Sequence, residues 1–412
     1  MQVLYNATMT STNALSPALE DWKKKLESDS RNPIRLEDLQ WQLSEEIRLN
    51  PIYDAGSLGP EHAYLIDFHK HWKEQKLNWK PAFKVSALPT ASLSENEIAE
   101  AEKLGFVAWS GIPVGGKNRV MAEPEFLDDP IVESLCAGNW TNDFKKLQQD
   151  RKLNSIQIHA SAFHHAGANA VEDLAFALVV AEQYRILIGN ERFSELAGNA
   201  TIHLGTGTSF FLEIARFRAM RLLWMNFCDQ NGAGKQAGNI QGETSLVTWS
   251  HSDPDSNLLR HTSAMMSAVM GGADSILVHP HTLDPTLASD AIRQSVNIGH
   301  LALEEAHLGD AIDPGSGSYL IEILSHELAQ KAWGLFCKWQ QMPFKETVES
   351  GFFAKTAEAS AEILKEKFAS GKLVMTGVNR HPSELARKSP AFPKQSDSET
   401  DFQSLKKLFL DA

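Results

Sequence analysis

Short apolar segments alternate with longer segments of helical period along the chain from residue 154 onward. The apolar segments NSIQIHAS, ATIHLGTG, TSLVTWS and DSILVHPH cover residues 154–161, 200–207, 244–250 and 274–281. The helical segments that follow them cover residues 170–189, 209–227, 256–272 and 286–306. In each helical segment apolar residues recur at i, i+3, i+4 and i+7, a spacing that buries one face against a sheet. The alternation predicts an α/β fold with a parallel sheet.

The same alternation extends toward both ends of the chain. Strands are expected at 83–88 and 106–112 with a helix at 94–105 between them, and a closing strand is expected at 372–379. Repeated βα units over roughly 300 residues favour a (β/α)8 TIM barrel. No G-x-G-x-x-G sequence opens a helix, which argues against the alternative, an open doubly wound sheet.

The terminal segments differ in composition from this central region. PALEDWKKKLESDS at 17–30 is typical of a surface helix, and the tryptophan-containing segment at 40–53 predicts an extended arm. The chain beyond residue 380 is polar and contains prolines before a short helix expected at its end. We therefore expect an N-terminal helix and arm at 1–55, a barrel at 56–380 and a polar tail at 381–412.

The charge balance limits the kinds of partner. The 412 residues include 39 Lys and Arg against 52 Asp and Glu, so the formal net charge is −13. Such a surface disfavours nucleic acid and anionic membranes as partners. The cysteines, Cys136, Cys228 and Cys337, are too widely spaced for a zinc motif or a disulfide framework, which favours the reducing cytoplasm. No leader and no run of about 18 apolar residues is found, so a soluble chain is expected.

Candidate chemical groups gather where the predicted strands end. In a barrel enzyme, the loops after the strand carboxyl ends carry the chemistry. His159, His164 and His165 follow one such strand, and their imidazoles are able to bind a metal or transfer protons. The alternative is that they cap a helix or form buried hydrogen bonds. In the next loop Gly205 and Gly207 allow positive φ and close approach of a ligand, although a tight βα turn explains them equally well.

Two later groups of residues supply further hypotheses. Charged residues in the helix after that loop have spacings that allow ion pairs to its neighbours: Glu213, Arg216, Arg218 and Arg221. His279 and His281 form an H-x-H sequence at a predicted strand end, as metal-dependent barrel hydrolases require. In those hydrolases the paired histidines come from the first strand, so this sequence is similar to them only in part.

Three long phrases stand in the order and spacing of a known family. They are FHHAGANAVEDLAFALVVAEQYRILIG, GTSFFLEIARFRAMRLLW and LEEAHLGDAIDPGSGSYLIEILSHELAQKAW. Together with QWQLSEEIRLNPIY and KLVMTGVN, they resemble the barrel domain of methylmalonyl-CoA mutase over about residues 40–380. The resemblance implies isomerisation of methylmalonyl-CoA and succinyl-CoA with adenosylcobalamin, a cofactor that starts radical chemistry.

The resemblance also implies that the catalytic pair of the family is lost. Catalytic members have a tyrosine and a histidine just before an A-G-A sequence, where the histidine donates a hydrogen bond to the thioester carbonyl. Counting back from Ala166, these positions are Ser161 and Ala162 in this chain. His164 and His165 lie past the lost histidine and are poor substitutes unless the loop is shifted in register.

Other positions of the family site differ as well. Asn199 and Thr201 stand where the family has an arginine and a serine that hold coenzyme A. The segment Asn-Ile-Gln-Gly, which contains Gln241, stands where the family has an R-T-H-S sequence facing the corrin. The uncharged segment DAGSLGP replaces an arginine-rich loop. We expect these degenerate positions to leave no catalytic residue and no metal site.

This pattern resembles the small, or β, subunit of heterodimeric methylmalonyl-CoA mutases. The family's cobalt ligand lies in a D-x-H-x-x-G sequence, and the nearest approach here, Asp67 to Trp72, lacks the glycine. We therefore expect a structural chain without a cobalamin-binding domain, paired with a large α subunit that holds adenosylcobalamin. Acyl-CoA is expected only in that complex. The alternative is an active acyl-CoA mutase barrel that uses His164 or His165 and cobalamin from a separate subunit.

Overall fold

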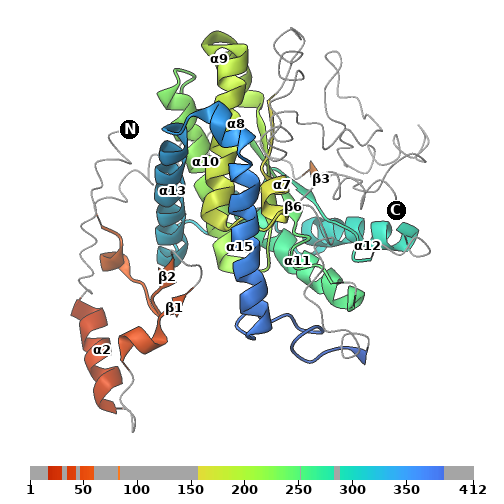
Figure 1. The fold of residues 1–412 in the computed structure, drawn as a ribbon. Helices are drawn as coiled ribbons and strands as arrows, with labels where there is room; N and C mark the ends of the chain where they lie inside the picture. The colour runs from red at the N-terminus through yellow and green to blue at the C-terminus, as the bar shows by residue number, and fades with distance from the viewer. Residues whose placement is uncertain are drawn as a thin grey trace.

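The computed structural model describes residues 17–29, 35–42, 47–59, 82–83, 156–250, 252–282 and 288–384 (Figure 1). A five-stranded parallel sheet with the order β3-β7-β6-β5-β4 lies at the centre of the described part. Its strands are β3 (Ala82–Phe83), β4 (Gln157–His159), β5 (Thr201–Thr206), β6 (Asn239–Thr244) and β7 (Ser275–Leu277). The predicted α/β class and parallel sheet are confirmed.

Strands β4 to β7 follow one another in the sheet in the same order as in the sequence. Between them the chain forms α8 (Ala170–Ile188), α10 (Phe210–Gln230) and α11 (Pro254–Met270). Right-handed crossovers that always advance in one direction place successive helices on one face of the sheet. The described residues form an open five-stranded sheet and not a closed one, so the TIM barrel stays a prediction.

The remaining described helices flank this unit. They are α2 (Pro17–Asp29), α7 (Ser161–His165), α9 (Asn190–Leu196), α12 (Ala288–His300), α13 (Tyr319–Gln340), α14 (Phe344–Glu349) and α15 (Phe352–Ala369). Short turns of other helix types are η1 (Leu36–Leu39), η2 (Ala55–Ser57), η5 (Ala197–Asn199) and η7 (Leu301–Glu305). No helix of the described part combines the length and the apolar character needed to cross a membrane.

The two faces of the sheet differ in character. One face carries buried apolar side chains: Ile158, Ile202, Leu204, Ile240 and Ile276. This face packs on α10 and α11, because a Cβ at Gly242 would come within 3.1 Å of Phe217 and 3.0 Å of Ala268. The opposite face is polar and carries Gln157, His159, His203, Gln241, Glu243 and Ser275. Barrel interiors are usually filled by branched apolar residues, so the polar face is where chemistry is to be sought.

Helix α13 lies beside α8 and α10 and closes the core on the helical side of the sheet (Figure 1). Phe336 of α13 packs against Phe227 of α10 with ring centroids 6.0 Å apart. Phe353 of α15 packs against Phe176 of α8 at 5.5 Å. Edge-to-face aromatic pairs of this kind add packing energy beyond their buried area. They connect the last helices of the described part to the helices of the βα units.

Three buried arginines fix α10 against its neighbours. Each guanidinium is at most 1% exposed and reaches a different part of the molecule. Arg216 bonds to Asp173 on α8 and Glu213, Arg218 to Asp313 and Glu322, and Arg221 to Asp274. The predicted ion pairs of this helix are confirmed.

The N-terminal segment contains α2 and a short antiparallel hairpin of β1 (Trp41–Gln42) and β2 (Arg48–Leu49). Ile47 and Leu49 are buried and belong to the main hydrophobic core. Burial raises the pKa of the Tyr53 phenol, which lies near Glu327 of α13. The helix predicted at 17–30 is confirmed as α2, whereas the segment predicted as an extended arm contains the antiparallel strands β1 and β2; the turn η2 that follows contacts α13 (Figure 1).

Two predicted strands are wrong. The strand expected at 244–250 lies earlier, as β6, and residues 245–250 form turns and loop. The segment 372–379 forms turns, with an isolated bridge between Thr376 and Arg380. Gly377 has a φ of +84° there, and the Asn379 side chain accepts a hydrogen bond from the Met375 N–H at 2.7 Å. Such a local bond competes with a strand ladder.

Several predictions lie outside the described residues. They are the strand at 83–88 beyond Phe83, the helix at 94–105, the strand at 106–112, the Asp67 to Trp72 segment and the tail beyond residue 384. These stay predictions from the sequence.

Candidate functional site

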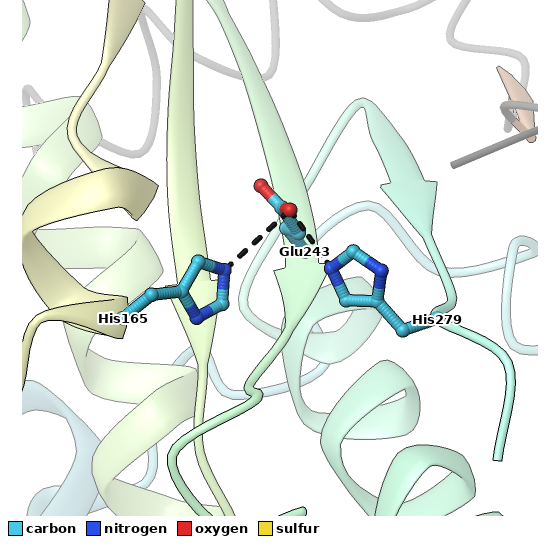
Figure 2. Close-up of side chains that lie close together, drawn as sticks. All are labelled: His165, Glu243 and His279. Carbon is cyan, nitrogen blue, oxygen red and sulfur yellow. Dashed lines mark hydrogen bonds and ion pairs between the residues drawn. The ribbon is translucent and has the colours of Figure 1, made fainter. Parts of the chain in front are cut away.

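Three elements of the sheet region direct side chains toward one point near the strand carboxyl ends. His165 is the last residue of α7, which follows β4, Glu243 lies near the end of β6, and His279 follows β7. Figure 2 shows the two imidazoles on opposite sides of the Glu243 carboxylate. We call these three residues the His–Glu–His cluster. No other group of three metal-ligating side chains comes so close together in the described part of the chain.

One carboxylate oxygen serves both imidazoles of the cluster. His279 Nε2 lies 2.8 Å from Glu243 Oε1, and His165 Nε2 lies 3.5 Å from the same oxygen. The His165 and His279 side chains are 6% and 3% exposed, whereas that of Glu243 is 16% exposed. The cluster is therefore shielded from water except on the glutamate side.

Backbone contacts fix the position of His279. Its N–H donates to Thr244 Oγ1 at 2.8 Å. Its carbonyl oxygen lies 2.8 Å from His261 Nδ1 and accepts a hydrogen bond from Ser295 Oγ at 3.0 Å. Strand β6, helix α11 and helix α12 thus all hold the residue that carries this imidazole.

The electrostatics of the cluster favour an ionised glutamate. Burial acts to raise the pKa of Glu243, but the hydrogen bonds and charges of the two imidazoles hold that pKa well below its ordinary value. The Leu246 N–H donates to His165 Nδ1 over a long 3.4 Å, so Nε2 is the ring nitrogen that faces Glu243. The cluster is a carboxylate flanked by two imidazoles.

His164 fills the space beside β5 instead of joining the cluster. Its Nε2 lies 2.9 Å from Ser245 Oγ, and its Nδ1 lies 4.0 Å from Asp173. A Cβ at Gly205 would come within 2.3 Å of the His164 ring, so glycine is required there by the chain's own imidazole. Burial, followed by the charge of Arg216, holds the pKa of His164 well below its ordinary value. His164 is thus a partly buried histidine whose ring is hydrogen-bonded within the protein.

The glycines of the same loop do not use the backbone freedom expected of them. Neither Gly205 nor Gly207 has a positive φ. A Cβ at Gly207 would lie 3.0 Å from Glu213 Oε1. Both positions therefore accommodate side chains of the protein itself.

The structure does not bring the five degenerate family positions to one place. Ser161 and Ala162 are buried in the first turn of α7, at the carboxyl end of β4. Asn199 and Thr201 lie at the opposite end of the sheet, just before and at the start of β5. Gln241 is buried in the middle of β6, level with His203 and Ser275.

The H-x-H pair does not form the metal site that the sequence suggested. His279 belongs to the His–Glu–His cluster, but His281 does not. The carbonyl oxygen of His281 accepts a hydrogen bond from Asn257 at 2.9 Å. His159 stacks on His203 with ring centroids 4.0 Å apart, on the polar face of the sheet.

Glu243 is the cluster residue that the sequence reasoning misses. The predicted strand at 244–250 begins just after Glu243, which places this residue before the strand and not near its carboxyl end. A signal was present, because Asn239, Gln241 and Glu243 alternate with Ile240 and Gly242. Alternation with period two indicates a strand with one polar face.

Together these features define an α/β protein whose parallel sheet gathers polar side chains near the strand carboxyl ends. The profile of the family described as methylmalonyl-CoA mutase matches residues 142–409, well over half of the chain. The chain belongs to the methylmalonyl-CoA mutase family.

Similar proteins cover only part of this chain. The probable methylmalonyl-CoA mutase small subunit of Mycobacterium tuberculosis is 32% identical over 243 residues, 57% of this chain and 39% of that protein. The methylmalonyl-CoA mutase small subunit of Propionibacterium freudenreichii subsp. shermanii is 29% identical over 258 residues, 61% of this chain and 40% of that protein. The methylmalonyl-CoA mutase of Cereibacter sphaeroides is 33% identical over 251 residues, 58% and 34% of the two chains. The chain thus spans about two fifths or less of the length of these relatives.

Proposed function

We propose that this chain is the small (β) subunit of a heterodimeric, adenosylcobalamin-dependent methylmalonyl-CoA mutase and that it is structural, not catalytic. The proposal rests on the identity of the two residues in the first turn of α7. Ser161 and Ala162 occupy the positions of the family's tyrosine and histidine, and both are buried. A methyl group has no proton to donate to a thioester carbonyl, and electrostatic stabilisation of that oxygen is a large term in acyl chemistry.

The packing around these positions supports a structural role. The His164 ring lies against Gly205, and the His159 and His203 rings stack on the polar face of the sheet. His203 in turn lies 3.1 Å from Gln157 Oε1. A substrate entering along this face would have to displace hydrogen-bonded side chains of the protein.

The residues present do not fit the cofactor at the family positions. Ser161 and Ala162 offer one hydroxyl and one methyl group, both buried, where the family uses a phenol and an imidazole. We therefore assign adenosylcobalamin to the large (α) subunit and acyl-CoA to the complex. Two of the relatives are named small subunits, which supports pairing with a larger chain.

The proposal includes the barrel and the division of the chain. Strand β3 comes from the N-terminal half yet pairs with β7, the last of the consecutive series, as closure of a barrel would require. We assign residues 1–55 to the subunit-contact arm, 56–380 to the barrel and 381–412 to the tail. Cys228 and Cys337 are free, which fits the cytoplasm.

The test is to purify the chain alone and together with the large subunit of the same organism. We expect a one-to-one complex by light scattering, with turnover of methylmalonyl-CoA and cobalamin absorbance only when the large subunit is present. Ser161→Ala in this chain should leave turnover by the complex unchanged, whereas alanine at the matching tyrosine of the large subunit should lower it. Turnover by the isolated chain with added cobalamin would refute the proposal and favour an active barrel.

A further inference from the structure

The His–Glu–His cluster has the composition of a transition-metal site. Two imidazoles and one carboxylate from different elements are the ligands of many zinc and non-haem iron centres, and they leave coordination positions open. We propose that His165, Glu243 and His279 bind one divalent transition-metal ion, with zinc as the best match. This inference does not depend on the mutase assignment, because it rests on the cluster alone.

The spacing of the ligand atoms is close to what zinc needs. Bonds of about 2.0–2.1 Å in a tetrahedron place neighbouring ligand atoms about 3.3–3.4 Å apart. The two distances to Glu243 Oε1, 2.8 Å from His279 Nε2 and 3.5 Å from His165 Nε2, lie on either side of that value. All three ligand atoms lie within 4.8 Å of one another. The three ligand atoms therefore lie near the spacing of a zinc site.

The elements that carry the ligands are well fixed. Glu243 lies on β6, which pairs with β5 on one side and β7 on the other. The backbone of His279 is held at both its N–H and its carbonyl oxygen. A site built on fixed elements keeps its geometry better than a site on loops. The glutamate supplies a partly buried negative charge that balances half of the charge of a divalent cation.

Metal binding determines which nitrogen of each ring carries the proton. Both Nε2 atoms face Glu243, and a metal bound there needs their lone pairs, so the proton of each ring then lies on Nδ1. At His165 a proton on Nδ1 breaks the hydrogen bond from the Leu246 N–H, which is weak at 3.4 Å. We expect this cost to place the affinity below that of a fully preorganised site.

The test measures metal binding by the isolated chain. After treatment with a chelator and its removal, the protein is titrated with Zn²⁺ by calorimetry and with Co²⁺ by visible absorption. We expect one equivalent of Zn²⁺ and a Co²⁺ band that Zn²⁺ abolishes. Glu243→Gln keeps the side-chain shape and removes the charge, and His165→Asn removes one ligand. Each should lower the affinity by at least about 100-fold, more than changes beyond the ligands themselves do.

His281→Ala is the matched control, because His281 lies two residues from a ligand but outside the cluster. The Zn²⁺ affinity of this variant should stay within about twofold of that of the wild type, because His281 makes no bond to the metal. Circular dichroism and urea unfolding show which variants are folded, and either ligand variant alone is sufficient for the test. The proposal is overturned if the wild-type chain does not bind one equivalent of zinc. It is also overturned if folded Glu243→Gln or His165→Asn binds zinc as tightly as the wild type does, or if His281→Ala abolishes zinc binding. None of these results bears on mutase activity, so the two proposals can fail separately.

Discussion

At the scale of single residues, buried charge determines which side chains the fold cannot lose. Arg216 is fully buried and donates to Glu213 Oε2 at 2.8 Å, to Asp173 and to the Gly205 carbonyl. Desolvation of these charges is offset by their mutual attraction and hydrogen bonds. Loss of one partner leaves the others buried without compensation.

We predict that, above the pKa of Asp173, Arg216→Met lowers the free energy of unfolding by about 3–5 kcal/mol, because it leaves the carboxylates of Asp173 and Glu213 without their cation. Urea denaturation followed by circular dichroism measures the change. Arg293→Met is the control, since Arg293 pairs with Asp290 on an exposed surface and should change stability by less than about 1 kcal/mol. Equal effects of the two substitutions would contradict the prediction.

The pH dependence of stability should report the state of Asp173. Burial raises its pKa to about 7, although Arg216 acts in the opposite direction. In the unfolded state the pKa of Asp173 is about 3.9. Between about pH 4 and pH 7 the folded state therefore keeps a proton on Asp173 that the unfolded state has released. The contribution of Asp173 to the free energy of unfolding therefore falls as pH rises from about 4 to 7, by at most about 1.4 kcal/mol per pH unit.

Asp173→Asn isolates this contribution. The unfolding free energy of the wild type minus that of the variant should decrease between pH 4.5 and 7.5, because asparagine does not titrate. A difference that increases with pH for Asp173→Asn would mean that Arg216 outweighs burial.

At the scale of elements, helices with an apolar stripe were predictable, and so were the strands β4 and β5, whereas the strand β6 was not. The helix expected at 170–189 is α8 and the helix expected at 209–227 is α10, because burial against a sheet imposes the helical period. Strand β6 was misplaced, since it alternates polar with apolar residues and contains Gly242. The apolar segment 372–379 forms turns because the Asn379 side chain accepts a hydrogen bond from the Met375 N–H and donates one to the Leu373 carbonyl oxygen, which satisfies these backbone groups locally.

The start of α8 should be sensitive to its cap. Asn169 Oδ1 accepts hydrogen bonds from Val171 and Glu172 N–H, and Glu172 Oε2 accepts from the Asn169 N–H in return. We predict that Asn169→Ala lowers the free energy of unfolding by about 1 kcal/mol. Ser209, the N-cap of α10, makes no such bond, so Ser209→Ala should cost less than about 0.5 kcal/mol in the same urea titration. A larger loss of unfolding free energy for Ser209→Ala than for Asn169→Ala would contradict the assignment of Asn169 as the stabilising cap.

At the scale of the whole molecule, the class of fold was predictable, whereas the candidate site was only partly so. His165 and His279 were recognisable as histidines near strand ends, but 114 residues of sequence separate them. Two histidines lie close together in the sequence at each position, His164 with His165 and His279 with His281. Sequence spacing does not tell which member of each pair faces Glu243. That choice depends on packing, such as the contact of His164 with Gly205.

Association with a large subunit should stabilise the chain by mass action. A partner present at 100 times its dissociation constant raises the free energy of unfolding by about 2.7 kcal/mol. Pulse proteolysis in urea, read from the 45.6 kDa band of this chain, measures the shift. Adenosylcobalamin alone should give no shift, and serum albumin at equal concentration is the control. Stabilisation by the cofactor without the partner would contradict the assignment of the cofactor to the large subunit.

Helix α10 has a consequence for how this chain can change in evolution. Arg216, Arg218 and Arg221 leave the helix in three directions, toward α8, toward Asp313 and α13, and toward Asp274 before β7. Insertion of a single residue before Arg216 would turn all three by about 100° and separate each from its acid at once. Surface loops generally tolerate the gain or loss of residues. In α10, by contrast, the acidic partners of the three arginines fix the number of helical residues that precede Arg216.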